Sequence, residues 1–165
     1  MKIFDCFMFY DEELLLDIRL NILDKYVDFF VIVESQFYHN GVKRQLKFDI
    51  KKFNKFKDKI IYIQYKNEPD QISKLNEKDD ESIKSYKLIH NAHLRENDQR
   101  NHILNGLKKA KNDDLILISD VDEIPNFNSI NLSKIKKLKL PCTIITDFKK
   151  TVPDIDLIIV CTPLS

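Results

Sequence analysis

Two aspartates separated by a single residue, Asp120 and Asp122, directly follow an apolar run at residues 114–119. Such a run is typical of a strand covered on both faces of a sheet. Carboxylates in this arrangement can hold Mn²⁺ or Mg²⁺ through oxygen while leaving coordination positions open for the oxygens of a diphosphate. The plain alternative is an acidic turn whose side chains are solvated or cap the next helix. The apolar run before the pair and the Ile-Pro sequence shortly after it favour a metal site.

A long helical pattern at residues 82–110 carries a second polar feature. At about 100° per residue, one face of this helix collects Ala92, Glu96, Gln99, Ile103, Leu107 and Ala110. Glu96 and Gln99 therefore interrupt an apolar face, and Arg95 and Arg100 flank it. Because buried polar groups are costly unless they are paired, these side chains either find partners within the fold or face a ligand.

Strand and helix signals alternate along the chain, which predicts an α/β domain with a mostly parallel sheet. The predicted strands cover residues 2–9, 29–33, 59–64, 114–119, 142–146 and 157–161, and the predicted helices cover residues 12–25, 82–110 and 132–138. The aromatic and basic stretch at residues 37–57 is predicted to be a loop with a short helix. In the first helix, Asp11 is the predicted N-cap, and Leu15, Ile18 and Ile22 form the predicted apolar stripe.

Glu34 immediately follows the second predicted strand. Open α/β sheets bind ligands at the carboxyl ends of their strands, so we expect Glu34 at the same sheet edge as Asp120 and Asp122. With only two glycines, Gly41 and Gly106, the chain can contain neither of the Gly-rich phosphate-binding loops. A nucleotide would have to bind by another device, and the aspartate pair could supply it.

Length and charge limit the other possibilities. A chain of 165 residues favours one domain, and a formal charge of +1 gives no overall attraction to nucleic acid. The basic stretch at residues 43–59 also contains Asp49 and Asp58, and we interpret it as a solvated face. No segment approaches the ~20 apolar residues of a membrane span, so no integral membrane segment is expected. The three cysteines lack any ligand spacing and the start lacks a cleavage site, which predicts a reducing, cytoplasmic setting.

Several ordered blocks together resemble a known family. They are residues 4–7 with Glu12, Leu15 and Arg19, residues 27–35, Arg95-Glu96 with Gln99-Arg100-Asn101, Gly106-Leu107, and residues 118–125. In this order they resemble glycosyltransferase family 17, the family of the β-1,4-mannosyl-glycoprotein N-acetylglucosaminyltransferases and their bacterial relatives. The resemblance covers about residues 1–130.

The resemblance implies a GT-A-like (Rossmann-like) nucleotide-sugar-binding domain and a metal-dependent transfer of a sugar, typically N-acetylglucosamine, from a UDP-sugar to a glycan acceptor, as in N-glycan processing. Asp120 and Asp122 would hold Mn²⁺ or Mg²⁺ and the donor diphosphate. The implied donor-binding residues are Glu34, Arg95, Gln99, Arg100 and Asp120. No catalytic base is identified, and Glu123 is either a further site residue or a helix cap or salt-bridge partner.

The resemblance assigns residues 1–138 to the GT-A-like domain and leaves residues 139–165 as an unmatched, aberrant-looking segment. Because family members are longer, we expect a truncated chain, and a remnant that binds donor without catalysis is one alternative. The other is a haloacid-dehalogenase-like, metal-dependent phosphohydrolase, whose nucleophile motif is also Asp-x-Asp after an apolar strand. That motif usually lies near the N-terminus and precedes a small pair, whereas Glu123-Ile124-Pro125 follows here.

Overall fold

The computed structural model describes residues 1–128 and the backbone of a strand at residues 157–160. In this part of the chain the strands are β1 (Ile3–Phe9), β2 (Phe29–Ser35), β3 (Ile60–Tyr65), β4 (Leu115–Ile118) and β5 (Leu157–Val160). The helices are α1 (Glu13–Leu23) and α2 (Glu81–Asn101), with 3₁₀ helices η1 (Ile50–Phe56) and η2 (His102–Gly106). The predicted helix at residues 132–138 and strand at residues 142–146 lie outside the described residues.

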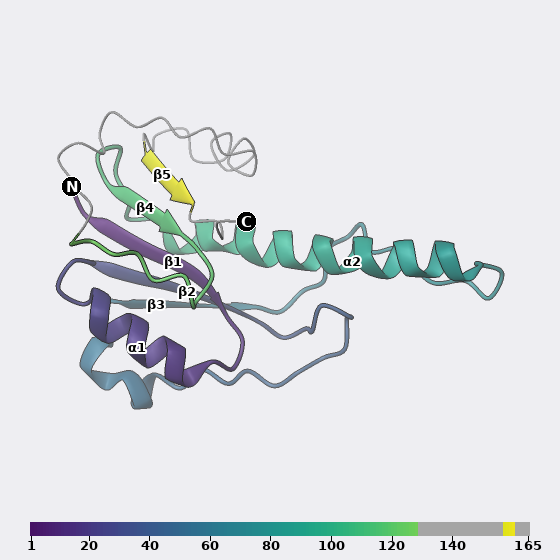
Figure 1. Cartoon of the computed structure of the whole chain (residues 1–165), viewed down its shortest axis with the longest axis horizontal. Coiled ribbons are helices and arrows are strands. Elements are labelled where there is room, and N and C mark those ends of the chain that lie inside the picture. Colours follow the sequence, from purple (N-terminus) through teal and green to yellow (C-terminus); the bar gives the residue numbers. More distant parts are fainter. Residues whose placement is uncertain (129–156, 161–165) are drawn as a thin grey trace.

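The strands form one open sheet in the order β3-β2-β1-β4-β5, and every neighbouring pair is parallel (Figure 1). The predicted α/β class and parallel sheet are thus confirmed, with a Rossmann-like arrangement. From β1 the chain moves outward to β2 and β3, and it then crosses to the other side of β1 to form β4. The direction of winding therefore reverses between β1 and β4. In open α/β sheets such a reversal leaves a crevice at the carboxyl ends of the two strands.

Each face of the sheet has its own core because successive side chains of a strand point to opposite faces. On the face covered by α1 and η1, the strands contribute Ile3, Phe7, Phe9, Phe30, Ile32, Leu115 and Leu117. On the face covered by η2 they contribute Phe4, Cys6, Val31, Val33, Tyr65, Ile116 and Ile118. Both faces of the central strands are thus apolar, as their uninterrupted apolar runs predict.

The predicted orientation of α1 is wrong. Its buried residues are Leu16, Arg19, Leu20 and Leu23. Ile18 and Ile22 are instead 39% and 48% exposed, and Leu15 is 36% exposed. Apolar residues of α1 occur on several sides of the helix, so their spacing does not define one buried face. The burial of Arg19 fixes the rotation of the helix about its axis. The N-cap is Glu12 rather than Asp11, because the helix begins one residue later than expected.

Helix α2 is shorter than predicted and extends well beyond the sheet (Figure 1). It ends at Asn101, and the chain tightens into η2, where Gly106 lies against β2. A Cβ atom at Gly106 would approach Cγ1 of Val31 to 2.4 Å, so this contact needs a residue without a side chain. Residues 67–80, which lead into α2, are exposed or half-buried. Throughout the described part of the chain, each helix is too short or too polar to cross a bilayer.

Candidate functional site

A cleft of about 810 Å³ opens at the carboxyl ends of β1 and β4. Its walls are the end of β1 (Met8, Phe9, Tyr10), the start of the α1 segment (Glu12, Leu15), a loop (Tyr38, His39, Asn40), α2 (Glu96, Gln99) and the turn after β4 (Asp120, Val121, Asp122). The cleft thus lies where the winding of the sheet reverses, the common ligand position in this class of fold. Its volume falls in the range of small-molecule sites.

Both aspartates of the Asp-x-Asp pair line this cleft. The side chain of Asp120 is 48% exposed, and its Oδ1 lies 3.2 Å from Nη2 of Arg100. Arg100 also contacts Glu96, at 3.2 Å. The structure therefore brings Gln99, Asp120 and Asp122 to one cleft and places Arg100 beside it.

The two aspartates suit a cation that arrives with a diphosphate. Among the described residues, no group of three or more His, Cys, Asp and Glu side chains is arranged to hold a metal ion. Mg²⁺ and similar hard cations are commonly bound by one or two carboxylates, with substrate phosphates and water filling the other positions. The carboxylates of Asp120 and Asp122 fit that role, because both line open space large enough for a ligand.

The two remaining α2 residues of the predicted site have structural partners. Gln99 is buried and donates a hydrogen bond from Nε2 to the carbonyl oxygen of Val33, 3.0 Å away, while still lining the cleft. Arg95 is also buried; its Nη2 lies 2.6 Å from Oε1 of Glu68, and its Nη1 donates to the carbonyl oxygen of His39 at 2.9 Å. Arg95 thus supports the loop at residues 38–40 through its hydrogen bond to the backbone of His39. Direct contact between Arg95 and a donor stays a prediction.

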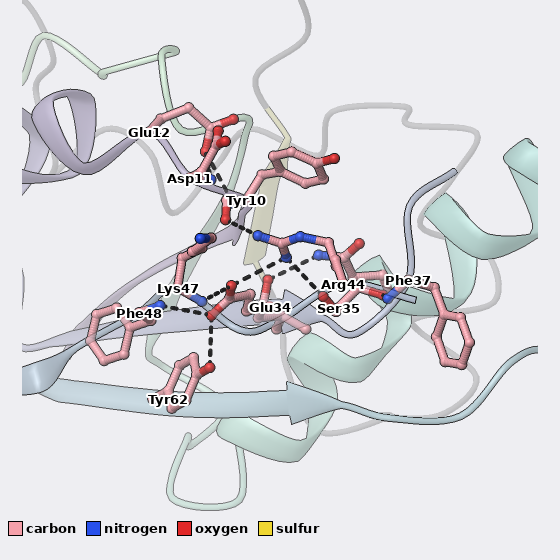
Figure 2. Close-up of polar contacts among 12 residues, drawn as sticks. Tyr10, Asp11, Glu12, Glu34, Ser35, Phe37, Arg44, Lys47, Phe48 and Tyr62 are labelled. Carbon is pink, nitrogen blue, oxygen red and sulfur yellow. Dashed lines mark hydrogen bonds and ion pairs between the residues drawn. The ribbon is translucent and has the colours of Figure 1, made fainter. Parts of the chain in front are cut away.

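Glu34 is fully buried at the end of β2, and its carboxylate contacts four groups within the protein (Figure 2). It accepts hydrogen bonds from the backbone N–H groups of Lys47 (2.6 Å) and Phe48 (3.0 Å) and from the hydroxyl of Tyr62 (2.8 Å). Its Oε1 also lies 3.2 Å from Nη1 of Arg44. Burial and the Glu34 carboxylate together raise the pKa of Tyr62. Glu34 thus holds the segment after β2 in place, and its contact with a donor stays a prediction.

Arg44 is a residue that the sequence analysis missed. It donates hydrogen bonds to the backbone carbonyl oxygens of Ser35 (2.8 Å) and Tyr10. Its guanidinium carbon lies 4.1 Å from the ring centre of Tyr10 and 5.9 Å from that of Tyr38, whose rings are 5.5 Å apart. We call Tyr10 and Tyr38 the tyrosine wall of the cleft. Burial and the neighbouring Tyr38 raise the pKa of Tyr10 above its ordinary value.

Arg19 is the second missed residue. It is completely buried and donates to the backbone of the turn that carries the aspartate pair, including the carbonyl oxygen of Asp120 at 2.7 Å. In the sequence, Arg19 stands in a helix with apolar residues on several sides, and nothing local marks it as buried. Its only signal was its place in the blocks that resemble a family.

A family model described as glycosyltransferase family 17 matches residues 1–145 of the chain. The matched range contains β1 to β4, both α-helices and every residue that lines the cleft. The resemblance found in the sequence blocks is thereby confirmed. No curated protein and no solved structure matches the chain.

Proposed function

The chain belongs to glycosyltransferase family 17, and we propose that its cleft binds a UDP-sugar together with Mn²⁺ or Mg²⁺ for sugar transfer to a glycan acceptor. N-acetylglucosamine is the proposed sugar. The observation that carries the proposal is the position of the Asp-x-Asp pair: Asp120 and Asp122 line a cleft that the tyrosine wall also lines.

The part of the cleft lined by the aspartate pair suits the diphosphate. Asp120 and Asp122 would hold the cation, which would supply positive charge to the departing diphosphate when bound. Arg100, 3.2 Å from Oδ1 of Asp120, adds a fixed positive charge beside the pair. Because its partner Glu96 also lines the cleft, the guanidinium is held within reach of a phosphate that enters there. Gln99 would contact the donor from the same helix.

The part of the cleft lined by the tyrosine wall suits the base. The tyrosine wall offers flat apolar surface, and aromatic side chains bind nucleobases through stacking. His39 and Asn40 follow Tyr38 on the same loop and add polar groups that can bind the edge of a uracil. In this arrangement Glu34 and Arg95 contribute to donor binding by holding the walls, since both are buried against protein partners. Family membership favours this reaction over the phosphohydrolase alternative.

The test is calorimetric and thermal-shift binding of UDP and UDP-N-acetylglucosamine, with and without Mn²⁺. A ligand at 100 times its Kd should stabilise the protein by about 2.7 kcal/mol, or roughly 5 to 10 °C for a chain of this length. Asp120→Asn and Asp122→Asn should abolish the part of this stabilisation that depends on Mn²⁺. Asp58→Asn, an exposed aspartate outside the cleft, is the matched control.

The proposal is contradicted if no UDP ligand binds the wild-type protein. It is also contradicted if both aspartate variants bind UDP ligands and Mn²⁺ as tightly as the wild-type protein does. Release of UDP in the presence of a panel of glycans then separates an active transferase from a protein that binds donor without turnover.

A further inference from the structure

Arg19 forms an ion pair in the interior of the domain, beneath the aspartate pair. Its Nε and Nη2 donate to the two carboxylate oxygens of Asp5 at 2.8 and 2.7 Å, and both side chains are fully buried. The guanidinium carbon also lies 4.6 Å from the ring centre of Phe7. A buried ion pair is weak evidence for a stabilising role, because apolar residues of the same size are often as stable. Arg19 makes four further hydrogen bonds besides this pair.

Those other contacts all go to the turn after β4. Nη1 of Arg19 donates to the carbonyl oxygens of Asp120 (2.7 Å), Val121 (3.1 Å) and Glu123 (3.1 Å). Nη2 donates to Oγ of Ser119 at 2.6 Å. These partners are 100 to 104 residues away in the sequence. A single side chain of α1 thus binds four of the five residues from Ser119 to Glu123, the segment that contains the Asp-x-Asp pair.

The direction of these carbonyl groups determines where the carboxylates can go. With the carbonyl oxygens of Asp120 and Val121 turned inward to Arg19, the side chains of Asp120 and Asp122 line the cleft. The side chain of Glu123 closes the turn by accepting a hydrogen bond from the backbone N–H of Asp120 at 3.0 Å. Arginine can do this because its planar guanidinium carries five N–H donors in a fixed fork, whereas lysine presents a single point charge.

We infer that Arg19 is the positioning residue of the aspartate pair: by binding the turn carbonyls, it fixes the separation of the Asp120 and Asp122 carboxylates at which they bind a divalent cation. The inference rests on the proposed function of these aspartates. Asp5 in turn fixes the guanidinium, since it binds the opposite edge of the fork. Partners behind metal ligands typically contribute a factor of roughly 10 to 100 in metal affinity.

The first test replaces Arg19 with lysine and titrates Mn²⁺ in the presence of UDP. Arg19→Lys should raise the Mn²⁺ concentration for half-maximal UDP binding by roughly 10- to 100-fold. Binding of uridine, which has no phosphate, should be unchanged, because the hydrogen bonds of Arg19 go to Asp5 and to the turn after β4. Leu20→Ala is the matched control: it removes a buried side chain of the same helix and should lower stability without altering the Mn²⁺ dependence.

A second variant protects the test against misfolding. Asp5→Leu with Arg19→Met removes both charges together, and a buried pair replaced in this way usually leaves a folded protein. It should show the same loss of Mn²⁺ affinity as Arg19→Lys. If both variants fold and bind Mn²⁺ and UDP as the wild type does, the inference is overturned. If neither variant folds, Arg19 serves the core as a whole, and the inference is overturned as well.

Amide hydrogen exchange gives a readout that needs no ligand. The N–H groups of Glu123 and Ile124 bind the carbonyl oxygens of Asp120 and Asp122 within the turn, each at 3.1 Å. In Arg19→Lys these amides should exchange faster, while the amides of β2 keep their rates. Wild-type protein that binds no Mn²⁺ and UDP would contradict the proposed function. Exchange at residues 119–124 would then still decide whether Arg19 holds the turn, and unchanged rates would overturn that role.

Discussion

Replacing Glu34 with glutamine tests whether this residue anchors the protein or contacts a donor. In the wild-type protein the carboxylate accepts from two backbone N–H groups and from Tyr62, and it lies 3.2 Å from Nη1 of Arg44. Glutamine keeps the shape but loses the charge. It also places an NH₂ group opposite either the N–H of Lys47 or that of Phe48, where a donor then faces a donor.

The expected cost follows from these contacts. A hydrogen bond to a charged group contributes about 1.5 to 3 kcal/mol, and breaking a buried ion pair costs about 3 to 5 kcal/mol because one charge remains uncompensated. Since Glu34 is fully buried and Arg44 nearly so, we expect Glu34→Gln to lower the free energy of unfolding by about 3 to 5 kcal/mol. For a chain of this length the melting temperature should fall by on the order of 10 °C.

The assay is urea unfolding followed by circular dichroism, with three variants beside the wild type: Glu34→Gln, Arg44→Met and the double variant. If the two side chains interact, the double variant should lose less unfolding free energy than the two single variants lose together, by about 0.5 to 3 kcal/mol. Glu13→Gln is the matched control. Glu13 pairs with Lys52 at 2.5 Å, but both side chains are about half exposed, so its loss should cost under about 1 kcal/mol.

The reasoning is refuted if Glu34→Gln costs no more than the Glu13 control and shows no coupling to Arg44. Uridine binding distinguishes the two possible roles. A loss of uridine affinity without a loss of stability would mean that Glu34 contacts the donor directly, as its position at the strand end suggests.

Three further predictions concern the fold around the cleft. Gly106→Ala should destabilise the protein by about 1 to 3 kcal/mol in urea unfolding, because the new Cβ would lie 2.4 Å from a valine methyl of β2. Burial and the Asp98 carboxylate raise the pKa of Tyr65 above its usual 10.0. The unfolded chain therefore releases this proton first, so the contribution of Tyr65 to stability should be constant below about pH 10 and fall above it, and the fall should be shallower in Tyr65→Phe. Leu20→Ala should cost about 2 to 5 kcal/mol and Ile18→Ala less than about 1 kcal/mol, and equal costs would contradict the orientation of α1.

The strands and the position of the cleft could be predicted because each depends on short-range sequence. The uninterrupted apolar runs of β2 and β4 can only be buried on both faces, which requires a sheet covered on each side. The Asp-x-Asp pair lies directly after β4, and the rule for open α/β sheets then places it in the crevice. No knowledge of distant residues is needed for either step.

The rotation of α1 and the buried polar contacts around the cleft depend on pairs of residues that are far apart in the sequence. The rotation of α1 follows from the burial of Arg19, and Arg19 is buried because Asp5 and the turn carbonyls neutralise and bind it. Likewise, Arg44 lies in a stretch rich in lysine, and only the fold shows that it meets Glu34 and Tyr10. Periodicity identifies the buried face only where apolar side chains are confined to it, and it cannot identify a polar side chain whose partner lies elsewhere in the chain.

The central place of β1 has a consequence for synthesis of the protein. One edge of β1 pairs with β2, which follows within a few tens of residues, but the other edge pairs with β4, and the backbone N–H of Lys2 binds a residue 112 positions later. At about 5 to 20 residues per second, a ribosome needs roughly 6 to 20 seconds to make the chain between them. During that time the three-stranded unit β1-β2-β3 presents the apolar strand β1 as an open edge, which is a site for pairing with other chains. The crevice and its aspartate pair form only when β4 pairs with that edge, so the same step that creates the site also covers the edge of β1.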